Sequence, residues 1–166
     1  MQLISPEKIF RGNGAWLKAL PQIKNFSKSP LLLGRSLATK DIRQQIYKDL
    51  HDENLSVYSS NLQFDCCYED LQRIKGVILK KNCDSIIAVG GGKVLDAGKF
   101  LADSLSIPVI TIPSSASTCA GWTALSNIYS IKGQFIEDIE LKSCPKILVL
   151  DHGFIKTAPN RTLSSG

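Results

Sequence analysis

The sequence predicts an α/β protein built on a mainly parallel sheet flanked by helices. Short β-like runs alternate along the chain with helical segments, which is typical of βαβ units. The runs PLLLG (30–34), SIIAV (85–89) and PVITI (108–112) are almost continuously apolar, as expected of strands covered on both faces. The chain has 166 residues, 43% of them hydrophobic and 21% charged, which suffices for one domain with a buried core.

The elements follow from local patterns of apolar residues, glycine and proline. We expect strands at 8–15 (ending in a glycine turn), 30–34, 55–59, 85–89, 108–112, 125–130 and 146–151. We expect helices at 16–23 (interrupted by Pro21), 38–52, 68–81, 93–105 and a short one from 152. In the third helix Leu71, Ile74, Ile78 and Leu79 are expected to form one apolar face. The segment 113–124 is predicted to be a loop of small polar residues, and the acidic stretch before 146 to be irregular.

Composition argues against several functional classes. The net charge is +5 and the pI about 9.0, but the basic residues are scattered and the densest patch is only Lys80–Lys81, so no nucleic-acid surface is expected. No apolar run approaches the roughly 20 residues of a membrane helix, and the N-terminus lacks a signal-peptide pattern. The five cysteines show no C-x-x-C pair and no zinc spacing. These features favour a cytoplasmic protein with reduced thiols.

Three glycines mark the exit of the strand at 85–89. Gly90, Gly91 and Gly92 allow a sharp turn and a close approach to a ligand. The following helix directs its free N–H groups at this loop, where an anion such as phosphate is favoured and Lys93 adds positive charge. Asp96, one turn further, can orient the loop or a ligand hydroxyl. The alternative is a tight turn that binds nothing, since neither a Walker loop nor G-x-G-x-x-G is present.

A second loop follows the strand at 108–112. It offers four hydroxyls within one turn region: Ser114, Ser115, Ser117 and Thr118. One such hydroxyl is explained by helix capping, but four beside the glycine loop indicate a pocket for phosphate or ribose. Ligands of parallel sheets bind at the carboxyl ends of the strands, so both loops are expected at the same edge.

Taken together, these segments resemble the iron-containing alcohol dehydrogenase and glycerol dehydrogenase superfamily. VGGGKVLDAGKFLAD resembles its G-G-G-[KS]-x-x-D-x-x-K signature, and PVITIPSSASTCAGWTALSNIYS resembles its strand, serine loop and following tail. TAPNRTLSSG is similar to the opening of the family's second domain. The resemblance implies a Rossmann-like fold, with a dinucleotide-binding domain at 1–158 and the start of a helical metal-binding domain at 159–166.

The resemblance also implies roles for individual residues. Family members transfer hydride between a nicotinamide cofactor and an alcohol or hydroxy acid, with a divalent metal that polarises the substrate oxygen. The cofactor pyrophosphate would be cradled by Gly91, Gly92 and Lys93, with Asp96 supporting the loop. The nicotinamide side would be contacted by Ser114, Ser117, Thr118, Thr123, Leu125 and Tyr129.

Departures from the family pattern bear on cofactor, substrate and metal. Arg35 stands where NAD-using relatives carry an acid, and an arginine accommodates a 2′-phosphate, which favours NADP over NAD. Cys119 replaces an aspartate that contacts polyols, which disfavours glycerol and admits a 2-hydroxy or 2-oxo acid; the alternative is a packed residue without chemical role. The implied metal ligands would follow Gly166, and His51 and His152 match none of them.

The leading hypothesis is therefore the nucleotide-binding half of a metal-dependent dehydrogenase, inactive alone and prone to self-association through its exposed cleft. The alternatives are a non-catalytic nucleotide-binding module, or a related enzyme resembling glycerol-1-phosphate dehydrogenase or dehydroquinate synthase.

Overall fold

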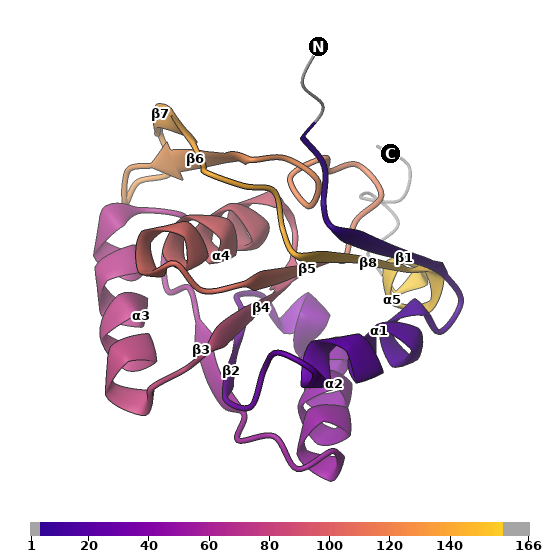
Figure 1. The fold of residues 1–166 in the computed structure, drawn as a ribbon. Coiled ribbons are helices and arrows are strands. Elements are labelled where there is room, and N and C mark those ends of the chain that lie inside the picture. The colour runs from indigo at the N-terminus through magenta and orange to yellow at the C-terminus, as the bar shows by residue number, and fades with distance from the viewer. Residues whose placement is uncertain (1–3, 158–166) are drawn as a thin grey trace.

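The computed structural model describes residues 4–157, which form a six-stranded parallel sheet between two layers of helices (Figure 1). The strand order is β1–β8–β5–β4–β2–β3, and every neighbouring pair is parallel. The strands of this sheet are β1 (Lys8–Gly12), β2 (Pro30–Gly34), β3 (Tyr58–Asn61), β4 (Ser85–Gly90), β5 (Val109–Pro113) and β8 (Ile147–Asp151). The expected fold class is confirmed.

Helices cover both faces of the sheet. α1 (Ala15–Lys24) and α2 (Lys40–Asp52) lie on one face, and α3 (Tyr68–Lys81) and α4 (Gly92–Leu105) lie on the other (Figure 1). A 3-10 turn, η1 (Leu37–Thr39), precedes α2, and the short α5 (His152–Lys156) follows β8. The predicted domain boundary at 158 and the segment 159–166 lie outside the described residues.

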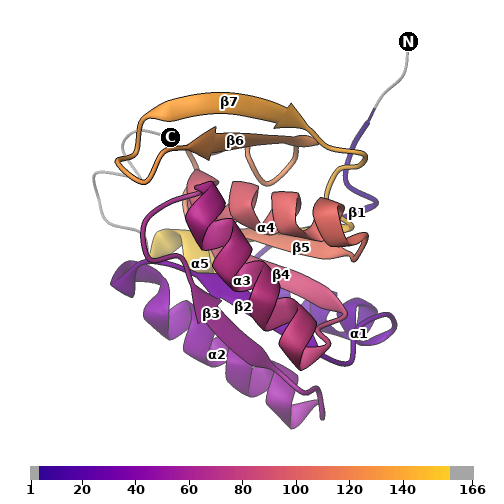
Figure 2. The same ribbon diagram turned by 90° about the vertical axis from the view of Figure 1, so that its left-hand side faces the viewer.

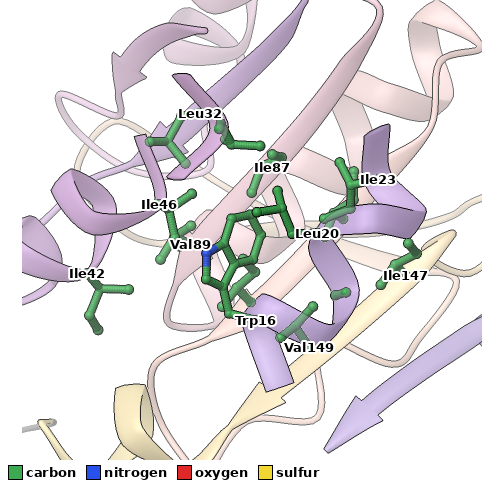
Figure 3. Packing of buried hydrophobic residues seen from close by; sticks show 14 of the residues in the cluster. Trp16, Leu20, Ile23, Leu32, Ile42, Ile46, Ile87, Val89, Ile147 and Val149 are labelled. Carbon is green, nitrogen blue, oxygen red and sulfur yellow. The ribbon is translucent and has the colours of Figure 1, made fainter. Parts of the chain in front are cut away.

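Side chains of the central strands alternate between two cores. In β2, Leu32 faces α1 and α2, whereas Leu31 and Leu33 face α3 and α4. Trp16 is the largest side chain of the first core and lies near Val89 of the sheet (Figure 3). Its indole N–H donates to Asp49 Oδ2 at 2.8 Å, which links α1 to α2 across this core.

Strand β1 forms the edge of the sheet beside β8. The buried carboxylate of Asp151 holds together the helices that begin at the ends of these two strands. Asp151 Oδ2 accepts from the backbone N–H of Trp16 at 3.0 Å, and its Oδ1 accepts from that of Gly153 at 2.8 Å. One aspartate therefore satisfies free N–H groups at the start of both α1 and α5.

The acidic segment predicted to be irregular is a strand. β6 (Leu125–Tyr129) and β7 (Phe135–Glu140) form an antiparallel hairpin that lies over α4, on the side away from the main sheet (Figure 2). Gly133, at φ 81°, makes the turn between them. β7 escaped prediction because almost all its side chains are exposed, so FIEDIE shows no clear apolar alternation.

Three smaller expectations were wrong. α1 continues through Pro21, whose missing N–H affects the carbonyl of Leu17 on an exposed part of the helix, where water can replace it. The strand expected at 55–59 is shifted to Tyr58–Asn61, because Leu55 is instead packed into the core beneath α2. Leu79 is 58% exposed and does not belong to the buried face of α3.

Helix α4 packs unusually close to β4. A Cβ built on Gly98 would lie 2.6 Å from Cβ of Ala88, which is closer than real Cβ contacts allow. Glycine at this position therefore sets the distance between α4 and the sheet, and with it the position of the loop that joins β4 to α4.

Gly98→Ala should destabilise the fold by about 1–3 kcal/mol, because the added methyl overpacks this contact. Urea unfolding would measure the change, and Ala88→Gly in the same chain should recover part of it. Gly76→Ala in α3 is the matched control: nothing lies within 4 Å of its Cβ, so it should stabilise by roughly 1 kcal/mol through helix propensity. Equal effects of the two alanines would contradict the close-packing argument.

Candidate functional site: two adjoining clefts at the edge of the parallel sheet

The winding of the sheet reverses between β2 and β4. These strands are neighbours, yet β2 leads outward to β3 on one side while β4 leads to β5 on the other. Connections after β2 and after β4 therefore separate at the carboxyl edge and leave a crevice between them. Such a switch point is where parallel α/β sheets bind ligands.

The glycine loop lies at this point. Gly90 ends β4, Gly91 is the N-cap of α4 in an extended conformation, and the helix begins at Gly92. The first turn carries no acidic residue, and no side chain caps its N–H groups. The N-terminus of a 14-residue helix is thus directed into the crevice, with backbone donors and the positive end of its dipole.

The serine loop lies directly beside it, as the sequence predicted. Gly90 and Pro113 are paired across β4 and β5, and the N–H of Ser114 donates to the carbonyl of Gly90 at 3.0 Å. A Cβ on Gly92 would lie 3.2 Å from Thr118 Oγ1, so the missing side chain lets the two loops approach. Ser115 and Ser117 share a hydrogen bond of 2.8 Å between their hydroxyls.

Two clefts meet at the glycine loop. The larger, of about 610 Å³, lies toward α2, and the smaller, of about 320 Å³, lies toward the β6–β7 hairpin. Both are lined by Gly92 and Lys93. The predicted residues Arg35, Gly91 and Ser114 line the larger cleft, and Asp96, Ser117, Thr118, Cys119, Thr123, Leu125 and Tyr129 line the smaller.

Lys93 has partners that the sequence did not reveal. Its ammonium forms an ion pair with Asp65, a carboxylate that is 4% exposed, and lies 4.4 Å from the ring centroid of Tyr129. Lys93 therefore reaches toward the smaller cleft in this structure, while its backbone belongs to the glycine loop. Its predicted contact with a pyrophosphate remains a prediction.

A fully buried lysine supports the smaller cleft. Lys99 is 1% exposed and contacts Asp96 Oδ1 at 3.0 Å, Thr123 Oγ1 at 3.1 Å and the carbonyl of Leu125. Burial raises the pKa of Asp96, while the charge of Lys99 and a hydrogen bond from it act in the opposite direction. The lysine thus connects α4 to two predicted cofactor-contacting positions on the neighbouring segment.

The cysteines divide by exposure. Cys119 is exposed and lines the smaller cleft, whereas Cys66, Cys67, Cys83 and Cys144 are buried. Burial is the main cause that raises the pKa of the Cys66 thiol, and the nearby carboxylates of Asp96 and Asp65 add to it. Cys119 is therefore the accessible thiol among the described residues.

No group of three or more His, Cys, Asp or Glu side chains that could hold a metal ion occurs within residues 4–157. The described residues therefore do not fit a metal centre. Within the same range, no helix has the length and apolar character needed to cross a membrane.

The structure brings all twelve predicted site residues to these two clefts. Sequence reasoning gave no role to Asp65 or Arg43 and no contacts to Lys99. A signal for Lys99 existed, since it follows Asp96 by one turn of the same helix. No local signal could have identified Asp65, which meets Lys93 from 28 positions away.

Fold and site together define a doubly wound α/β protein with its crevice at the carboxyl edge of the sheet. A model of the family described as iron-containing alcohol dehydrogenase matches residues 6–152, and the chain belongs to this family. The recognition made from the motifs is thus confirmed.

Two curated relatives show how similar the chain is to other members of this family. It is 29% identical over 162 residues to a glycerol dehydrogenase of Citrobacter freundii, covering 98% of this chain and 44% of that protein. It is 41% identical over 102 residues to an uncharacterized oxidoreductase of Synechocystis, covering 61% of this chain and 26% of that protein. The chain spans less than half the length of these relatives.

Solved structures agree with the fold. Glycerol dehydrogenase from Schizosaccharomyces pombe superposes with a TM-score of 0.86 at 27% identity, over 99% of this chain and 42% of that chain. An NADH-dependent butanol dehydrogenase from Thermotoga maritima gives 0.86 at 18% identity, over 98% of this chain and 46% of its own, and supports the fold alone.

Replacing Lys99 by methionine should cost roughly 3–5 kcal/mol at neutral pH, because it leaves the buried Asp96 carboxylate unpaired. A carboxyl whose pKa is raised in the folded state destabilises when ionised, so the loss should diminish as pH falls through that pKa. Urea unfolding at several pH values would measure this. The double variant Lys99→Met/Asp96→Asn should lose the pH dependence, and a double variant that keeps it would contradict the pairing.

Proposed function

We propose that this chain is the nucleotide-binding half of a metal-dependent NAD(P) oxidoreductase that acts on the hydroxyl of a small alcohol, polyol or 2-hydroxy acid. The observation that carries the proposal is the N-terminus of α4, which opens without a side-chain cap into two adjoining clefts at the switch point of the sheet. Membership of the iron-containing alcohol dehydrogenase family supports it.

The two clefts suit the two halves of a dinucleotide. In our proposal the pyrophosphate lies at the glycine loop, where both clefts meet and backbone N–H groups are free. The adenosine extends along the larger cleft toward Arg35. The nicotinamide enters the smaller cleft, between Thr118 and the apolar side chains of Leu125 and Tyr129.

Asp96 and Lys93 then act on the protein side of this site. The carboxylate of Asp96 pairs with Lys99 at 3.0 Å, and its backbone carbonyl accepts from the hydroxyl of Ser126 at 2.9 Å, which links α4 to β6. Lys93 forms an ion pair with Asp65 and lies over the ring of Tyr129, so it links these two residues. Both residues would hold the wall of the smaller cleft in place before the nicotinamide binds.

The cofactor that we favour is NADP. Arg35 follows the end of β2 at the mouth of the larger cleft and forms no ion pair within residues 4–157. Such an arginine can bind a 2′-phosphate, whereas an acidic residue would repel it.

The substrate class is supported by relatives and by one residue of the smaller cleft. Relatives along most of this chain are named glycerol dehydrogenase and, in Halobacterium salinarum, glycolaldehyde reductase. Cys119 lines the smaller cleft but cannot accept two hydroxyls as a carboxylate does. We therefore favour a small hydroxy acid or simple alcohol over glycerol. The metal that would polarise the substrate oxygen has no place among the described residues.

A second candidate is a nucleotide-binding module without catalysis. It rests on the same two clefts at the glycine loop. Cofactor binding by this chain is common to both candidates. Substrate-dependent reduction of NADP by the 166-residue chain would exclude the module.

Titration with NADPH and NADH, followed by nucleotide fluorescence, should show saturable binding that is tighter for NADPH. Arg35→Ala should weaken NADPH by about tenfold and leave NADH nearly unchanged, because one charge-assisted contact to the 2′-phosphate is lost. Lys18→Ala, an exposed change on α1, is the control. Failure of both nucleotides to bind would reject the proposed function.

Cys119 provides an independent measure of where the cofactor lies. Iodoacetamide should alkylate Cys119 well before the buried thiols, and saturating NADPH should slow that reaction by about tenfold if the nicotinamide half covers the smaller cleft. Peptide mass spectrometry would follow each thiol, and ADP-ribose, which lacks nicotinamide, should protect less. Equal protection by both nucleotides would place the nicotinamide elsewhere.

A further inference from the structure

A second arginine lies at the end of β2, beside the one that the sequence singled out. Arg43, from the first turns of α2, crosses the bare face of Gly34 so closely that a Cβ there would overlap its Cδ, Nε and Cζ atoms. Gly34 is the last residue of β2 and directly precedes Arg35. The missing side chain at Gly34 is thus the space that the Arg43 stem fills.

Arg43 is held by two groups of the larger cleft. Its Nη1 donates to the carbonyl of Ser36 at 3.1 Å and also contacts the hydroxyl of Thr39. Both Ser36 and Thr39 line that cleft. The guanidinium therefore braces the turn that carries Arg35. Its Nε and Nη2 groups donate to no acceptor within residues 4–157, and the side chain borders a neighbouring cleft that it shares with Lys40 and Asn61.

The charges around this turn are mostly positive. Arg35, Lys40 and Arg43 lie within nine positions, and none of them forms an ion pair within the described part of the chain. Asp41 is the only carboxylate in the first turn of α2. The start of α2 adds the positive end of its helix dipole. An anion is therefore favoured here.

We propose that Arg43 and Arg35 form a two-arginine subsite for the 2′-phosphate of NADP, with the turn over Gly34 between them. This inference rests on the proposed function and adds a specificity-determining residue to it. A phosphate monoester has three oxygens outside its ester bond, enough to accept from both guanidinium groups. Gly34 then contributes indirectly, because it lets Arg43 reach the turn.

The test compares two variants of the 166-residue chain by titration with NADPH and NADH. Arg43→Gln should weaken NADPH by about tenfold and change NADH by less than about twofold, because NADH lacks the phosphate. Lys48→Gln removes the same charge from an exposed position further along α2 and should change neither. Adenosine 2′,5′-bisphosphate should compete with NADPH for the parent chain and compete about tenfold less well for Arg43→Gln.

Gly34→Ala provides a second route to the same answer without removing a charge. The added methyl should displace the flexible Arg43 side chain and lower NADPH affinity by several-fold, about as far as Arg43→Gln does. Thermal unfolding should show both variants folded. Equal losses for NADPH and NADH would overturn the subsite and leave Arg43 a merely structural residue.

The remaining outcomes distinguish the role of Arg43 from that of Arg35 and from nucleotide binding itself. An unchanged NADPH affinity in Arg43→Gln, with a loss in Arg35→Ala, would overturn the role of Arg43 and retain that of Arg35. Binding of NADH without preference for NADPH in the parent chain would reject the two-arginine subsite but keep nucleotide binding. Binding of neither nucleotide would reject the proposed function itself.

Discussion

The close packing of α4 against β4 is the constraint on which the rest of the site depends. Because Gly98 has no side chain, the helix lies against Ala88, and its first turn meets the carboxyl end of β4 through only a short glycine loop. The same helix then directs Lys99 sideways into the carbonyls and hydroxyl of the 123–125 segment. One helix thereby positions an anion-binding end and the wall of the neighbouring cleft. A change in its distance from the sheet would move both.

The sequence predicted the sheet, its parallel character and the edge at which the loops meet, because these follow from local patterns. Continuous apolar runs identify buried strands, and glycine or serine immediately after such a run identifies the loops of the carboxyl edge. Gly90 and Pro113 are indeed paired neighbours. The β6–β7 hairpin was only half predicted, since β6 has one buried face against α4 whereas β7 is almost wholly exposed. Exposure removes the periodic signal from which a strand is recognised.

Contacts between distant side chains could not have been predicted in this way. Asp65 was a loop residue without pattern, and only the fold places it beside Lys93. From the sequence, Arg43 is expected to be a solvated arginine on a helix. Its contact with the turn after β2 depends on Gly34, nine positions earlier, which ends that strand. In the first case a buried carboxylate pairs with a lysine, and in the second a glycine leaves space for an arginine side chain. The spacing of residues along the chain does not predict contacts of this kind.

Charge is distributed unequally between the two clefts, and this difference bears on how a dinucleotide would lie. In the smaller cleft the cations are neutralised, Lys93 by Asp65 and Lys99 by Asp96. Around the turn after β2, Arg35 and Arg43 have no acidic partner within residues 4–157. Uncompensated charge attracts phosphate, whereas paired charge sets shape without selecting an anion. A dinucleotide bound with its phosphorylated ribose at the arginines and its nicotinamide between Tyr129 and Thr118 satisfies both ends, and the reverse orientation would leave the arginines facing an amide.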